Sequence, residues 1–142
     1  MTRYGFVRDA IAAALLLLSC GAGVWAEPFP FDQELLLEAA PMRPGKRMPI
    51  LTVEPNGGAK IDLWCRTVSA RIEISDAAMK IEADALPEGQ PEMLSAGQCT
   101  AERMQADEEL LGALIQVTGW HRQGDGIVLE GPKTLQFHPS DH

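Results

Sequence analysis

The chain has 142 residues, a net charge of −8 at pH 7 and 46% hydrophobic residues. This length fits one domain behind a leader. The acidic balance argues against nucleic acid and anionic lipid as partners, because like charges repel, and it allows a basic protein partner. The same charge can also serve solubility alone.

Residues 1–26 have the pattern of an export signal. Arg3 and Arg8 give a positive start, residues 10–19 form a short apolar run, and Ala26 ends a small-residue cleavage site. The run is shorter than the about 20 residues of a membrane-spanning helix. We therefore expect a periplasmic or secreted protein.

Cys20 gives this leader a second interpretation. Residues 17–20 read Leu-Leu-Ser-Cys, which resembles a bacterial lipobox, so cleavage before Cys20 would leave an acylated cysteine. The acyl chains would hold the domain at a membrane surface, as in a membrane-anchored lipoprotein. Cleavage after Ala26 is preferred, lipidation of Cys20 is the alternative, and a membrane is expected as a partner only through that anchor.

Behind the leader, residues 27–47 are expected to form an extended lead-in and a basic, proline-rich loop, since proline disfavours helix. Within them, residues 34–39 are an apolar run that fits a first strand or a short helix. Arg43, Lys46 and Arg47 form a local basic cluster, which is either a plain loop or a docking point.

Alternating apolar and polar residues predict the middle strands. These strands cover residues 50–54, 60–65, 68–74 and 79–83. A strong turn signal at residues 55–58 joins the first two. In the second strand, Ile61, Leu63 and Cys65 share one face. Trp64 then points the other way, where it is either covered by another element or exposed as a contact patch.

A long loop is expected over residues 84–97, and a helix follows it. Thr100 is the expected N-cap, because its hydroxyl can accept a hydrogen bond from a free backbone N–H of the first turn. The apolar face is assigned to residues at helical spacing, namely Met104, Leu111, Leu114 and Ile115. Asp107, Glu108 and Glu109 are assigned to the solvated side.

Three more strands and a short tail complete the prediction. The strands cover residues 116–123, 127–130 and 133–138, and the tail covers 139–142. Seven or eight short strands separated by turns favour a barrel or a curved sheet. The expected fold is α+β and mostly β: a small antiparallel, barrel-like sheet with one helix inserted before the last three strands.

Cys65 and Cys99 are the cysteines of the mature chain. In an oxidising compartment such a pair is a disulfide by default. In the chain-entropy model, closing this loop stabilises the fold by roughly 3–4 kcal/mol. No histidine stands near either cysteine in the sequence, and neither belongs to a Cys-x-x-Cys unit, so a metal site is not expected.

The sequence contains no pattern typical of catalysis. A hydrolase needs a nucleophile beside a positioned base, whereas His138, Ser140 and His142 stand in a tail with nothing to fix them. Residues 44–47 lack the flanking residues of a phosphate-binding loop. We expect no enzymatic activity, no cofactor and no metal.

A series of motifs marks the second half of the chain. Residues 61–65 read Ile-Asp-Leu-Trp-Cys, residues 117–120 read Val-Thr-Gly-Trp, residues 123–126 read Gln-Gly-Asp-Gly and residues 133–137 read Lys-Thr-Leu-Gln-Phe. In this order, residues 48–138 resemble the META domain, the HslJ-like family of small bacterial envelope proteins.

The resemblance implies a barrel-like α+β fold outside the cytoplasm, no established reaction, and a general association with stress response. The chain departs from the family at residues 64–66, where Trp-Cys-Arg stands in place of Gly-Cys-Asn. An asparagine at the third of these positions favours a turn, and Arg66 cannot supply that chemistry.

We therefore expect an exported, monomeric, non-enzymatic envelope domain that acts by binding or in stress response. Its partner is an unknown protein or envelope component, and nucleic acid is not expected. The candidate binding surface is Trp64 with Arg43, Lys46 and Arg47. The alternative is a secreted inhibitor of a basic enzyme such as a lysozyme, because a compact, acidic, disulfide-tied barrel suits that task.

Overall fold

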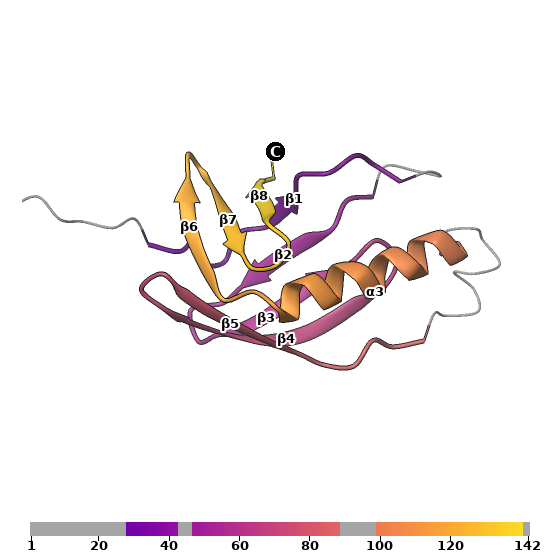
Figure 1. Cartoon of the computed structure of the whole chain (residues 1–142), viewed down its shortest axis with the longest axis horizontal. Helices are drawn as coiled ribbons and strands as arrows, with labels where there is room; N and C mark the ends of the chain where they lie inside the picture. The colour runs from indigo at the N-terminus through magenta and orange to yellow at the C-terminus, as the bar shows by residue number, and fades with distance from the viewer. Residues whose placement is uncertain (1–27, 43–46, 89–98, 141–142) are drawn as a thin grey trace, which may run out of the picture.

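The computed structural model describes residues 28–42, 47–88 and 99–140. Within these residues the chain forms eight strands and one helix (Figure 1). The strands are β1 (Leu35–Leu37), β2 (Ile50–Val53), β3 (Gly58–Asp62), β4 (Thr67–Ser75), β5 (Ala78–Ala83), β6 (Gly119–Gln123), β7 (Gly126–Glu130) and β8 (Leu135–Pro139). The helix, α3 (Ala101–Ile115), stands between β5 and β6, so three strands follow it.

The strands close into an antiparallel barrel in sequence order, because β8 returns to pair with β1. The predicted fold is therefore confirmed. The β4 and β5 strands pair along six positions, whereas β5 and β6 pair only between Ala78 and Gly119. The connection between β5 and β6 contains α3, which packs against β5 (Figure 1).

Side-chain alternation explains the two strands β4 and β5. Val68 and Ile72 of β4, and Met79 and Ile81 of β5, are buried, while their neighbours along each strand are exposed or half-buried. Burying one such side chain contributes about 1.5–3 kcal/mol. The predicted alternation is confirmed in both strands.

The barrel begins upstream of residue 48, the expected start of the domain. β1 pairs with both β2 and β8, and its Leu35 and Leu37 are buried. Of the two expectations for this apolar run, the strand is confirmed. Farther upstream, Phe29 is buried against Trp120 with 5.2 Å between ring centroids. Much of the lead-in therefore belongs to the domain, because its apolar side chains complete the core.

The predicted turn at residues 55–58 joins β2 to β3 and depends on Gly57. Gly57 has a φ of 94°, a conformation that side chains rarely allow. A Cβ atom there would lie 3.0 Å from the carbonyl oxygen of Ile72 in β4. The N–H of Ile72 donates to the carbonyl oxygen of Gly57 at 2.7 Å. Glycine thus allows this turn to approach β4 closely.

The face that α3 buries differs from the expected one. Its buried residues are spaced by four, three and four positions: Arg103, Asp107, Leu110 and Leu114. Ile115, which was assigned to the apolar face, is 52% exposed. The assignment of Asp107 to the solvated side was wrong. The buried stripe is half charged, so an apolar pattern does not reveal it.

Candidate functional site

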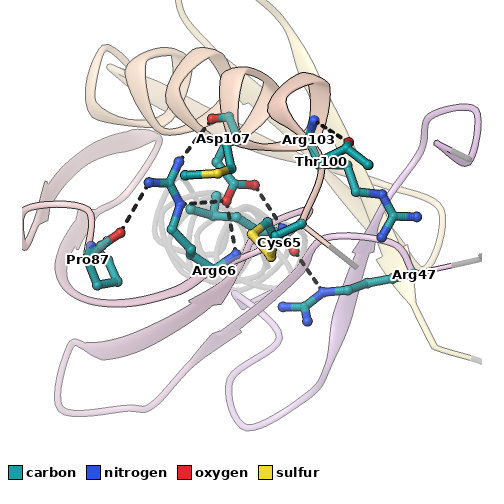
Figure 2. Close-up of polar contacts among 10 residues, drawn as sticks. Arg47, Cys65, Arg66, Pro87, Thr100, Arg103 and Asp107 are labelled. Carbon is teal, nitrogen blue, oxygen red and sulfur yellow. Dashed lines mark hydrogen bonds and ion pairs between the residues drawn. A yellow bond between two sulfur atoms is a disulfide. The ribbon is translucent and has the colours of Figure 1, made fainter. Parts of the chain in front are cut away.

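The expected disulfide is present between Cys65 and Cys99, with 5.3 Å between the Cα atoms. Both cysteines are buried. Cys65 lies in the turn between β3 and β4, and Cys99 directly precedes Thr100, the N-cap of α3. The Thr100 hydroxyl accepts the backbone N–H of Arg103 at 3.2 Å, as predicted (Figure 2). The disulfide therefore fastens the start of the helix to this turn.

Asp107 connects α3 to the same turn through a buried carboxylate (Figure 2). Its Oδ1 accepts the backbone N–H of Cys65 at 3.0 Å, and its Oδ2 accepts the backbone N–H of Arg66 at 2.9 Å. The Arg66 Nε also donates to Oδ2 at 3.0 Å. The Asp107 side chain is fully buried, and the Arg66 side chain is 9% exposed. These three hydrogen bonds, one of which comes from the Arg66 cation, offset the cost of burying the carboxylate.

The Arg66 guanidinium reaches two further segments. Its Nη1 donates to the carbonyl oxygen of Pro87 at 3.1 Å, and its Nη2 donates to that of Met104 at 2.9 Å. Arg66 thus joins the turn after β3, the segment after β5 and the helix. The sequence marked this position only as a departure from the family pattern, and no local motif announces its partners.

Trp64 does not lie where strand alternation placed it. β3 ends at Asp62, and the chain then turns, with the N–H of Leu63 donating to the carbonyl oxygen of Arg66 at 2.7 Å. Alternation has no meaning in such a turn, so Trp64 and its neighbour Cys65 are both buried. Trp64 is 7% exposed and belongs to the core, so of its two expected placements the covered one is confirmed, and its place in an exposed binding surface with the basic cluster was wrong.

A groove of about 650 Å³ opens between α3, the end of β1 and the start of β8. Its apolar lining consists of Leu37, Ala39, Met42, Trp64, Ala106, Leu110 and Leu135. Its polar lining is exposed and consists of Glu38, Glu102, Gln105, Glu109, Lys133, Thr134 and Gln136. The groove therefore has a mostly buried apolar base and a rim with more carboxylates than ammonium groups.

Buried polar contacts fix the walls of this groove. The Arg103 side chain is buried, and its Nη2 donates to the carbonyl oxygen of Met42 at 2.7 Å, which links α3 to the segment after β1. The Arg66–Asp107 pair links α3 to the turn that contains Trp64. Because these contacts lie inside the fold, the groove is preformed in the free protein.

The predicted basic cluster is described in part. Arg47 is exposed, and its Nε donates to the carbonyl oxygen of Leu63 at 3.1 Å (Figure 2). Arg47 thus lies beside the turn, while Trp64 faces the core, so the two form no common exposed surface. Arg43 and Lys46 lie outside the described residues, as do Cys20 and the rest of the leader.

Metal ligands do not cluster in the part of the chain that the structure describes. No group of three or more His, Cys, Asp or Glu side chains there could hold a metal ion. Two contacts each join one histidine to one carboxylate: the Nδ1 of His121 lies 2.6 Å from an oxygen of Glu130, and the Nδ1 of His138 lies 3.4 Å from an oxygen of Glu38. Among the described residues, no helix is both long and apolar enough to cross a membrane.

Comparisons with family models, with curated proteins and with solved structures gave no match to this chain. The resemblance to the META domain therefore stays a prediction from the sequence.

Proposed function

We propose that this chain is an exported, non-catalytic binding domain of the bacterial envelope, related to the META or HslJ-like family. The observation that carries this proposal is the preformed groove beside α3. A concave surface with an apolar base and a few polar groups at its rim is the usual form of a binding site.

Export is supported by two features at different places in the chain. Residues 1–26 have the three regions of a signal peptide. The Cys65–Cys99 disulfide fits an oxidising compartment, because cytosolic thiols are kept reduced. The proposed location is periplasmic or secreted, with attachment to a membrane only if Cys20 is acylated.

A reporter fusion tests export. The full chain is fused at its C-terminus to a phosphatase that is active only outside the cytosol. We expect an active fusion, and we expect deletion of residues 10–19 to abolish the activity because the apolar region of the signal is lost. Replacement of Cys20 by serine separates the two leaders: it releases the fusion from the membrane fraction only if Cys20 is acylated. An inactive fusion with the intact leader would contradict export.

A screen for substrate turnover tests the proposal that the domain is non-catalytic. The groove offers carboxylates and amides at its rim. Of these polar lining residues, Glu102 lies nearest the N-terminus of α3. We expect no turnover of peptide, ester, glycoside or phosphoester substrates by the purified mature chain. Turnover that disappears on Glu102→Gln would show an enzyme instead.

The acidic rim favours one second candidate, an inhibitor of a basic enzyme such as a lysozyme. Attraction between opposite charges speeds the association of two proteins, and salt weakens this attraction. Inhibition of lysozyme by the mature chain at low salt, relieved by added salt, would support this role. Unchanged lysozyme activity at low salt would remove it.

A further inference from the structure

We propose that the groove beside α3 binds a basic polypeptide segment that carries large apolar residues between two cationic ones. This inference rests on the proposed binding function and names the chemistry of the partner. It follows from the position of the charges on the rim, the nature of the base and the charge of the whole chain.

One wall of the groove is a single face of α3. Glu102, Gln105, Ala106 and Glu109 line it, at spacings of three, one and three positions. Such residues share a face of a helix. Seven residues of α-helix separate Glu102 from Glu109 by about 10 Å along the axis. Both side chains are exposed, so this wall presents two carboxylates with the small Ala106 between them.

The opposite wall adds a third carboxylate, Glu38, and one ammonium group, Lys133. Counted over the lining residues that the structure describes, the rim is negative by two charges. The base between the walls is apolar, with Trp64, Leu110 and Leu135 all buried to more than nine-tenths of their surface. A ligand that fills the groove must satisfy an apolar floor and an anionic rim together.

A basic polypeptide meets both requirements. In a polyproline II segment, which has three residues per turn and a rise of about 3.1 Å per residue, side chains three positions apart point the same way and are about 9 Å from each other. This spacing is close to the separation of the two helix carboxylates. The two side chains between the cations point to the other sides of the segment, so an apolar side chain there can turn toward the apolar base. Other occupants fit less well. The negative rim repels anionic lipid and nucleic acid, and it also repels a second copy of the chain, which has a net charge of −8.

The test uses the mature chain, residues 27–142, and a capped hexapeptide of sequence Gly-Lys-Leu-Phe-Lys-Gly. Two control peptides replace both lysines by glutamate, or the Leu-Phe pair by two serines. Titration calorimetry at about 0.01 M and about 1 M salt compares a Debye length of roughly 30 Å with one of roughly 3 Å. We expect the Lys-Leu-Phe-Lys peptide to bind at low salt and at least about tenfold more weakly at high salt. Both controls should bind more weakly at low salt.

Matched variants locate the binding. Glu102→Gln with Glu109→Gln should weaken peptide binding roughly tenfold at low salt, because two rim charges are lost. The control pair Glu73→Gln and Glu108→Gln removes the same charge from exposed positions that do not line the groove, and should weaken binding much less than the groove pair does. Gln105→Arg, which places a cation on the exposed helix wall between Glu102 and Glu109, should also weaken binding at low salt. Thermal melting checks that each variant is folded.

Three results would overturn the inference. The peptide fails to bind at low salt, or the control pair weakens it as much as the groove pair does. Alternatively, sedimentation shows a dimer that Gln105→Arg disrupts, so that a second copy occupies the groove. If the peptide fails while the reporter fusion is active, this inference falls and the exported binding domain stands. An inactive fusion removes the proposed function itself.

Discussion

Asp107 is a single residue that holds three separate segments in place. Its carboxylate binds the turn after β3 directly, and through Arg66 it reaches Pro87 and the helix backbone. A buried ion pair is often no more stable than apolar residues of equal size, but loss of one partner alone is costly. The value of the pair therefore lies in the arrangement that it enforces.

Asp107→Ala should lower the free energy of unfolding by about 3–5 kcal/mol, because it leaves the Arg66 cation buried without a counter-charge. The backbone N–H groups of Cys65 and Arg66 would also lose their acceptor. Urea unfolding followed by circular dichroism measures this change. Asp107→Asn keeps one acceptor oxygen and should lose less.

A double replacement provides the control. Arg66→Met with Asp107→Leu removes both charges together and should recover the part of the loss that comes from the unpaired Arg66 cation, while the backbone N–H groups of Cys65 and Arg66 stay without their acceptor. An Asp107→Ala protein as stable as the original would show that the buried pair does not hold these segments.

At this scale the sequence predicts local chemistry but not distant partners. Thr100 was predicted as a cap because its acceptor bond closes within three residues. The partners Arg66 and Asp107 stand 41 positions apart, and the helical pattern treats a charge as solvated. The buried face of α3 was therefore predicted correctly at Leu114 and wrongly at Asp107 and Ile115.

Among the elements, α3 is the one whose stability can be raised most simply. Gly112 lies inside the helix, and a Cβ atom added there would meet nothing within 4 Å. Gly112→Ala should raise the free energy of unfolding by up to about 1 kcal/mol, because alanine loses less backbone entropy in a helix. Urea unfolding measures the gain.

Gly126→Ala in β7 is expected to have the opposite effect on stability and serves as the comparison. A Cβ atom there would collide with the backbone carbonyl of Phe137 in β8. Backbone atoms of a paired strand cannot move aside cheaply, so Gly126→Ala should destabilise the protein. If both replacements changed the free energy of unfolding in the same direction, the open space at Gly112 and the close backbone contact at Gly126 would be contradicted.

The elements also show where alternation works and where it stops. It predicted β4 and β5 because both run through the sheet with one face buried. It failed at Trp64 because β3 ends two residues earlier and a turn replaces the strand. The groove could not be predicted, since β1, α3 and β8 approach each other only in the folded barrel.

For the whole molecule, the disulfide is expected to supply a large part of the stability. Replacing Cys65 and Cys99 together by serine should lower the free energy of unfolding by roughly 3–4 kcal/mol in the chain-entropy model. A domain has only about 5–15 kcal/mol in total. Differential scanning calorimetry would show a markedly lower Tm, and an unchanged Tm would contradict this role.

The same bond links the fold to its compartment. The cysteines stand 34 positions apart and join the turn after β3 to the residue before the helix N-cap, and such a bond persists where thiols are not kept reduced. Because the disulfide holds the start of α3, one wall of the groove, to the turn that contains Trp64, the shape of the groove is expected to depend on the oxidised Cys65–Cys99 bond.

The intact mass of the chain purified from its native host, with free thiols blocked at lysis, tests the export and oxidation of this domain most directly. We predict a product that begins at Glu27 and carries no blocked thiol; a product acylated at Cys20 would mean that the alternative leader is used. A product that retains residues 1–26 and carries blocked thiols at both Cys65 and Cys99 would contradict export.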